Sequence, residues 1–350
     1  MRLKLIPLIL LFMPALLSAQ TVAEWFRHPM MAAAVQIQEK YVPQDGSFKT
    51  IPLAMLKAAF GRESKDPFSV NLIFDIPSAR FLSCEATWQP IPQIGVHVGL
   101  QKMLFLYDSS FAPYMYGLMG YSQATSYLAG YASDLTGINS RSRDVGLVLE
   151  GSFFPAEGFS KLSYAVGVFN GNGYNFRDNN KGKDVHVRLI YQPISSLKFT
   201  VGAMNGYYNH DLEEEFGPHE HLHHYHLEEG LACRRRLSGG VWFDNGKWFA
   251  RSEDIFGITD GAKSNGIMAI AGWKFHPHYE TAARVDHFKM NFDDPNSAST
   301  KVDVCLTHHI TTDGTMYVAL QYGHTFYSDP SRPGLDTIML CLNLAFLRTL

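Results

Sequence analysis

Beyond its amino terminus, this sequence has no apolar run long enough to cross a membrane as a helix. The one long apolar stretch, residues 5–17, follows Arg2 and Lys4 and stops just before Ala19. At about a dozen residues it is too short to span a bilayer comfortably, and its layout is typical of a secretory signal peptide. We therefore predict a signal peptide over residues 1–19 and an exported chain.

Cysteine and net charge are also scarce. The four cysteines, Cys84, Cys233, Cys305 and Cys341, show no metal-ligand spacing such as CxxC. We expect small apolar strand residues, with a disulfide as the alternative that an oxidising compartment would allow. The 30 Lys and Arg against 33 Asp and Glu give a net charge of −3. This balance gives no indication of nucleic acid as a partner, and we expect no cofactor.

The sequence lacks a linker or a long low-complexity stretch, so we predict one domain over residues 20–350. Its pattern alternates apolar with polar or small residues. Between residues 161 and 170, Leu162, Tyr164, Val166 and Val168 alternate with serine, alanine and glycine. A period of two is typical of a β-strand. An apolar face would contact lipid on the outside of a barrel, and a small or polar face would line its lumen.

Counting such segments gives about sixteen strands, each near the length that a tilted transmembrane strand needs. The predicted fold is all-β: a transmembrane antiparallel β-barrel with short periplasmic turns and longer external loops. We expect Trp88, Trp242, Trp248 and Trp273 in aromatic girdles at the membrane interfaces. The expected strands are 31–41, 51–60, 68–76, 80–89, 94–102, 143–152, 161–170, 184–192, 196–206, 231–242, 247–256, 265–275, 279–289, 301–310, 315–324 and 335–347.

The connections support a barrel over a soluble sandwich, because short and long connections alternate, as in outer-membrane barrels. If the first strand starts in the periplasm, the third external loop is 103–142; the short connection 77–79 breaks the rule. The short turns are 90–93, 153–160, 193–195, 243–246, 276–278 and 311–314, and the longer external loops are 103–142, 171–183, 207–230, 257–264, 290–300 and 325–334.

A family resemblance lies in residues 143–193. Arg143-Asp144-Val145-Gly146 and Gly151 are followed by the stretch from Tyr164 to Gly171, and then by Asp184 and by Arg188 through Pro193. In order and spacing these motifs resemble the phosphate-selective porin family. The resemblance implies a trimeric, sixteen-stranded barrel whose third external loop folds inward and narrows the pore.

The predicted third loop lacks the residues that phosphate selection requires. It has no Lys or Arg between residues 103 and 140, and cations at a constriction are what replace the lost hydration of an anion. We predict a tyrosine-lined constriction that passes small polar or neutral solutes, or else tyrosines that pack the loop against the inner wall. The candidate constriction residues are Tyr107, Tyr114, Tyr116 and Tyr121.

Charges of both signs are expected to face the lumen, from their alternation with apolar residues. This mixture predicts weak ion preference. At least one of Arg234, Arg235 and Arg236 should face inward, and the others would suit lipopolysaccharide phosphates at the headgroup boundary. The candidate pore-lining residues are Lys102, Arg143, Asp184, Arg188, Lys198, Arg251, Arg284 and Asp286.

A His- and Glu-rich stretch in the loop 207–230 offers weak candidates for metal binding: His219, His221, His223 and His226. The alternative is a solvated loop of biased composition. Residues 219–223 match HExxH, but the polar surroundings provide no apolar helix face to bury such a site, so we read the match as chance and predict no enzyme.

The sequence therefore predicts an outer-membrane porin of a Gram-negative-type bacterium. It would form a water-filled channel for passive diffusion of small polar or ionic solutes, as a homotrimer embedded among lipid and lipopolysaccharide. The alternatives are a non-conducting or metal-capturing barrel and, less favoured, a hydrolase at the barrel rim.

Overall fold

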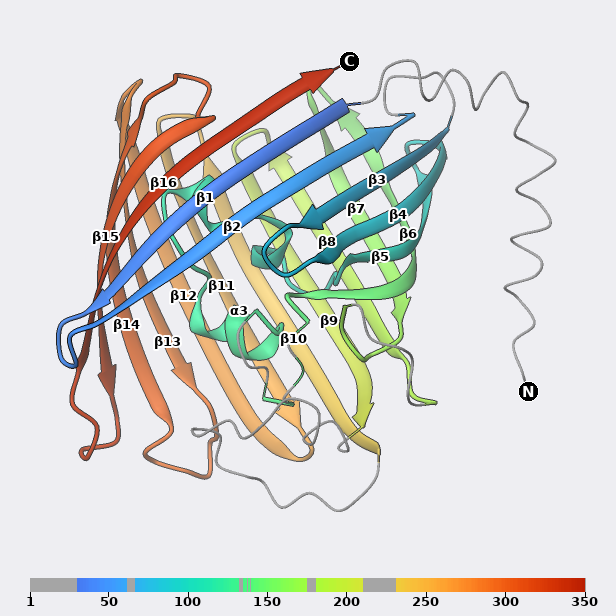
Figure 1. Cartoon of the computed structure of the whole chain (residues 1–350). Coiled ribbons are helices and arrows are strands. Elements are labelled where there is room, and N and C mark those ends of the chain that lie inside the picture. The colour runs from blue at the N-terminus through green and yellow to red at the C-terminus, as the bar shows by residue number, and fades with distance from the viewer. Residues whose placement is uncertain are drawn as a thin grey trace.

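Sixteen antiparallel strands close into a single barrel, in which each strand pairs with its sequence neighbours and β1 pairs with β16 (Figure 1). The computed structural model describes residues 30–61, 67–131, 135–136, 138, 140–174, 181–209 and 231–349. The predicted fold class is confirmed. The strands are β1 (Met30–Val42), β2 (Ser47–Phe60), β3 (Phe68–Asp75), β4 (Arg80–Ile91), β5 (Ile94–Lys102), β6 (Arg143–Ala156), β7 (Phe159–Phe169), β8 (Asp184–Ile194), β9 (Leu197–Asn209), β10 (Leu231–Asp244), β11 (Trp248–Thr259), β12 (Ala262–His276), β13 (Tyr279–Lys289), β14 (Ala298–His309), β15 (Met316–Tyr327) and β16 (Leu335–Thr349).

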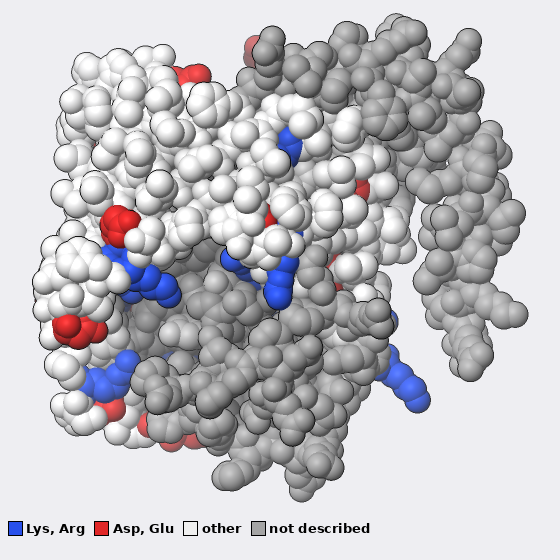
Figure 2. Space-filling model, viewed as in Figure 1, with Lys and Arg blue, Asp and Glu red and all other residues white. Residues whose placement is uncertain are grey.

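The two faces of the wall differ in polarity, because side chains alternate across each strand. On β8, Val185, Val187 and Leu189 are exposed on the outside, whereas Asp184 and His186 are fully buried inside. The same separation runs through β10 to β16, whose exposed large residues are mostly apolar. Figure 2 shows few charged side chains over the slanting strands β1 and β2 and more of them below.

Aromatic rings gather on the outer face near one end of the barrel. We call this the proximal end; β1 begins there and β16 ends there. Ring pairs bridge neighbouring strands, and Trp248 stacks on Trp273 with centroids 4.9 Å apart. Trp88, Trp248 and Trp273 are exposed outward, but Trp242 is only 8% exposed and faces inward, so its predicted girdle position was wrong. Strand alternation places it on the inward face of β10, with Arg236 and Ser238.

One predicted loop was also wrong. Instead of a long connection over 257–264, β11 continues to Thr259 and β12 starts at Ala262. The turn between them is Asp260-Gly261, and both residues have positive φ, 47° and 85°. Asp-Gly is a favoured pair for such two-residue hairpin turns because glycine and aspartate tolerate this backbone region.

The wall is low on one side. β3 and β5 are short, and β2 pairs with β3 only through its last residues, from Met55 to Phe60. Residues 47–53 of β2 therefore have no strand partner on that side among the described residues. Phe48, at 75% exposed, lies on this stretch.

Between β5 and β6 the chain turns into the barrel and forms two 3-10 segments, η1 (Asp108–Ser110) and η2 (Pro113–Tyr116), and the short helix α3 (Gln123–Leu128). Ser122 caps α3, its Oγ accepting a hydrogen bond from the Thr125 amide at 3.1 Å. No helix among the described residues is long and apolar enough to cross a membrane. All four cysteines are free, and Cys305 and Cys341 are buried inward-facing strand residues.

Candidate functional site

The segment 103–142, which we call the inner loop, packs against the inside of the barrel. Several apolar clusters hold it there. Phe105 and Leu128 of the loop pack with Met204 and Ile255 of the wall, and Leu118 packs with inward residues of β11 to β16. In Figure 1, α3 lies within the ring of strands. Leu104 also packs with Val148 of β6 and with Ala165 and Phe169 of β7. The contacts of the inner loop therefore run from β6 to β16.

Carboxylates of the wall hold the backbone of the inner loop. Glu253 is 1% exposed, and its two oxygens accept hydrogen bonds from the amides of Tyr107 at 2.9 Å and Asp108 at 2.8 Å. Asp286 accepts from the amide of Gln123 at 2.6 Å, at the start of α3. Backbone amides buried away from water need such partners, so these two carboxylates fix where the loop enters and where its helix begins.

A buried ion pair supports the middle of the loop. Arg284 donates to Asp303 through Nε at 3.0 Å and Nη2 at 2.6 Å, and its Nη1 donates to the carbonyl oxygen of Gly120 at 2.6 Å. Gln321 donates to Asp303 and accepts from the Met119 amide at 2.8 Å. The inner loop is therefore held by polar groups over most of its length, as well as by apolar packing.

The tyrosines of the inner loop mostly pack within the barrel. The rings of Tyr121 and Tyr131 contact each other at a tilt of 31°, with centroids 3.8 Å apart, and the Tyr121 hydroxyl donates to the Phe111 carbonyl oxygen at 2.7 Å. Burial raises the pKa of the Tyr121 phenol above its usual value, and the neighbouring Tyr131 adds to the shift. Tyr107 is 6% exposed. The side chains of Tyr114 and Tyr116 lie outside the described part of the structure.

The predicted pore-lining residues fall into two groups. Four of them, Asp184, Arg251, Arg284 and Asp286, are buried. The last three contact the inner loop, whereas Asp184 pairs with Arg234 of β10. The other four are half-buried and reach toward the loop. Lys102 donates to the Ser109 carbonyl oxygen at 2.7 Å, Arg143 donates to that of Arg141 at 2.9 Å, Arg188 donates to Ser110 Oγ at 2.7 Å and Lys198 donates to the Tyr107 hydroxyl at 3.3 Å.

Arg234 and Arg236 of β10 also face inward, and Arg235 faces outward. Arg234 pairs with Asp184 and donates to the Gly171 carbonyl oxygen at 2.7 Å. Arg236 donates to the carbonyl oxygens of Leu128 and Ile258. Most arginines expected in the pore thus bond the wall to the inner loop or to neighbouring parts of the barrel.

Sequence reasoning missed the roles of Glu253 and Ser238, which bond the loop from 130 or more positions away in sequence. No local signal in the sequence gives that pairing.

The wall formed by β2 to β6 carries half-buried charges of both signs. His97 lies 3.1 Å from Glu150, and Glu85 accepts from Asn71 at 2.9 Å. With Lys57 these residues line a cavity of about 410 Å³. This side therefore provides a polar surface opposite the apolar packing of the inner loop.

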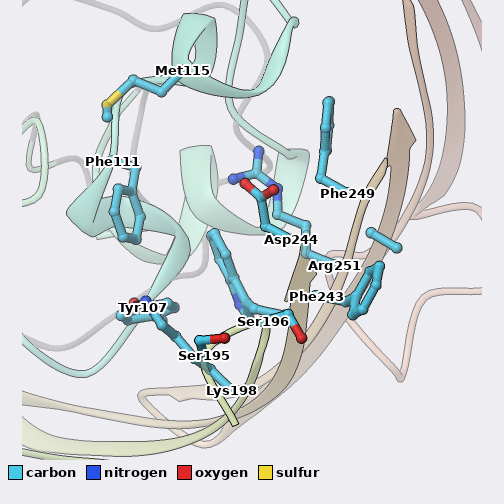
Figure 3. Close-up of a pocket in the computed structure, with 12 residues that line it drawn as sticks. Tyr107, Phe111, Met115, Ser195, Ser196, Lys198, Phe243, Asp244, Phe249 and Arg251 are labelled. Atoms are coloured by element: carbon cyan, nitrogen blue, oxygen red, sulfur yellow. Dashed lines mark hydrogen bonds between the residues drawn. The ribbon is translucent and has the colours of Figure 1, made fainter. Parts of the chain in front are cut away.

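A second cavity, of about 390 Å³, lies at the proximal end between the inner loop and β9 to β11 (Figure 3). Tyr107, Phe111 and Met115 of the loop face Lys198 and Arg251 of the wall across it. Its rim includes the β8–β9 turn, Ser195 and Ser196, and the exposed Asp244.

The metal candidates His219, His221, His223 and His226 lie outside the described residues. Among the described residues, no group of three or more His, Cys, Asp or Glu side chains could hold a metal ion.

No protein-family model matches the sequence, and no curated protein matches it in a sequence comparison. Solved porin structures do share its fold. The anion-selective porin from Comamonas acidovorans has a TM-score of 0.65 at 10% identity, over 91% of this chain and 99% of that chain. OprB from Pseudomonas putida has a TM-score of 0.65 at 10% identity, over 94% and 96%. OmpF from Salmonella typhi has a TM-score of 0.63 at 13% identity, over 91% and 97%. At these identities the likeness shows the fold alone.

Proposed function

We propose that this protein is an outer-membrane porin that lets small polar or ionic solutes diffuse through a water-filled channel. The observation that carries the proposal is the closed barrel, with an apolar outside, a charged inside and an inner loop packed against one part of the wall. A membrane strand must present apolar residues to lipid, whereas a solute path needs polar groups. The similar solved structures are porins, which supports the same function.

The outer face supports insertion in a membrane. Its proximal end carries stacked aromatic pairs, such as Trp248 with Trp273 and Phe275 with Tyr279. Aromatic rings are favoured at both membrane interfaces, because their apolar and polar parts meet both environments there. Short turns, such as the two residues between β8 and β9, lie at the proximal end, and short turns are periplasmic in outer-membrane barrels, so the proximal end faces the periplasm. Export follows from the signal peptide proposed for residues 1–19.

We also propose a homotrimer. The low wall at β3 and β5, with the exposed Phe48 beside it, leaves strand edge and apolar surface that a second copy would cover. The solved structures of similar fold include a trimer form of OmpT from Vibrio cholerae. The oligomeric state in detergent, measured by light scattering, tests this directly, and a monomer would contradict it.

Phosphate selectivity, which the family resemblance implies, is not part of the proposal. The described part of the inner loop has no Lys or Arg before Arg141, and Arg141 is paired with Asp75 at 2.8 Å. Half-buried cations and carboxylates both lie within the barrel, as Arg188 and Glu150 do. A lumen of mixed charge predicts weak ion preference.

The experiment is conductance of the purified protein in planar bilayers, with reversal potentials measured in KCl and in phosphate. We expect discrete conductance steps and little preference between potassium and chloride. No conductance at any voltage would contradict a porin and favour the non-conducting barrel. A strong preference for phosphate over chloride would show that wall cations replace those missing from the loop.

A further inference from the structure

The proximal cavity between the inner loop and β9 to β11 has an aromatic wall. The rings of Tyr107, Phe111 and Trp242 lie against one another, with centroids 4.7 to 5.3 Å apart. Phe111 and Trp242 both line the cavity, at which Phe249 provides a fourth ring. Its volume of about 390 Å³ is within the range of small-molecule sites. Such a wall suits a flat ring, which stacks on aromatic faces.

The same cavity contains the ammonium group of Lys198. Lys198 is half-buried, and its Nζ donates to the Tyr107 hydroxyl at 3.3 Å. No carboxylate pairs with Lys198 among the described residues. A cation held in a partly enclosed apolar site is stabilised by an anion, and a charge-assisted hydrogen bond is roughly twice as strong as a neutral one.

The other charges of the cavity limit how much negative charge it can take. The guanidinium of Arg251 lies over the Trp242 ring at 4.7 Å, and its Nη1 is 3.6 Å from Asp108. The carboxylate of Asp244 stands at the rim, where it accepts from the Gly246 amide at 2.7 Å. With two cations and one rim carboxylate lining the cavity, a single anionic group fits better than several.

We propose that this cavity is a binding subsite for a small solute carrying one oxyanion group, carboxylate or phosphate, on a flat ring. The oxyanion accepts from Lys198 Nζ, and the ring lies against Phe111 and Trp242. This inference rests on the proposed channel, since a solute crossing the barrel would pass the subsite at the proximal end. Binding has to be weak enough for release, as in any conducting site.

The test uses the folded, detergent-purified protein and ligand-observed NMR titration, which needs no conductance. The probes are benzoate and phenyl phosphate, with acetate as a charge without a ring and benzyl alcohol as a ring without a charge. We expect saturable binding of benzoate, of phenyl phosphate or of both, and little binding of the other two. Which of the two binds more tightly identifies the oxyanion. Equal binding of all four probes, or of none, would overturn the inference.

The decisive variant is Lys198→Gln, with Lys247→Gln as the control. Lys247 lies in the exposed β10–β11 turn at the same end of the barrel but does not line this cavity. Losing one charge-assisted hydrogen bond should weaken ring-anion binding about tenfold in Lys198→Gln. The control should bind as the original protein does. Unchanged affinity in Lys198→Gln, with unaltered heat-modifiable migration in gels, would refute the role of Lys198. Absent conductance together with specific binding would refute only the channel.

Discussion

Replacing Glu253 tests whether wall carboxylates hold the inner loop. Glu253 is buried, and each of its oxygens accepts one backbone amide of the loop, from Tyr107 and Asp108. In Glu253→Gln one oxygen becomes an amide nitrogen, which cannot accept, so one buried backbone N–H loses its partner. Hydrogen bonds to charged groups contribute about 1.5–3 kcal/mol, and a buried donor left unsatisfied costs about 1–3 kcal/mol.

A loss of about 2 kcal/mol raises the population of locally opened loop roughly thirtyfold, since about 1.4 kcal/mol is a factor of ten. Hydrogen exchange measured by mass spectrometry on peptides covering residues 103–122 should therefore show faster exchange in Glu253→Gln. Exchange in the paired strands β14 to β16 should not change. In planar bilayers the open current should become noisier, because the loop leaves the wall more often.

Glu85→Gln is the matched control. Glu85 is a half-buried carboxylate of the opposite wall, where it accepts a hydrogen bond from Asn71 of β3. Both variants remove one negative charge from the inside of the barrel, so a purely electrostatic effect on current should appear in both. The reasoning is refuted if loop exchange is unchanged in Glu253→Gln, or if Glu85→Gln accelerates it equally.

Three further predictions concern packing, charge and pH. In Gly202→Ala the new Cβ would overlap the Phe105 carbonyl oxygen, so loop exchange should rise and stability should fall by about 1–3 kcal/mol; the outward Gly239→Ala should change neither. Arg284→Met removes two charge-assisted hydrogen bonds from the buried Asp303, which keeps Lys301 at 3.0 Å, and should lower stability by about 1.5–3 kcal/mol, seen as a lower midpoint of heat-modifiable migration. Burial raises the pKa of the Tyr121 phenol in the folded protein above its ordinary value of about 10. The neutral phenol therefore contributes its full stability below pH 10, and that contribution falls as the pH rises above 10. The stability difference from Tyr121→Phe, followed by alkaline titration, should therefore change above pH 10 and not below.

The strands could be predicted from the sequence because their pattern is local. A lipid-facing side and an inner side impose period two on every strand, so all sixteen appear in the alternation of single segments. The two wrong predictions, of a loop and of a girdle residue, came from misreading local sequence signals. Asp260-Gly261 is a hairpin turn that was read as part of a longer loop. Trp242 was assigned to the girdle by residue type, although it shares its strand face with Arg234 and Arg236.

The position of the inner loop in the chain could be predicted from the sequence, but its contacts with the wall could not. Its lack of cations and its tyrosines are visible in the composition, whereas its anchors are not. Glu253 and Asp286 lie on β11 and β13, far along the chain from the amides that they accept. Contacts at such separation depend on how the closed barrel brings strands together. A helix as short as α3, with six residues, also gives little periodic signal.

The lack of cations between residues 103 and 140 has a structural counterpart in the wall. Arg188 and Lys198 lie over the Tyr107 ring, at 5.6 and 5.9 Å from its centroid, and Lys102 bonds the loop backbone nearby. The loop therefore contributes rings and carbonyl oxygens, and the strands contribute the positive charge that meets them. A cation on a strand is positioned by the hydrogen-bonded strands on both sides, which is more precise than a position on a loop. Because the strands supply the positive charge of the lumen surface, ion selectivity in this barrel should depend on wall residues such as Lys198. Exchanging loop tyrosines for phenylalanine should alter the selectivity less than removing one wall cation does.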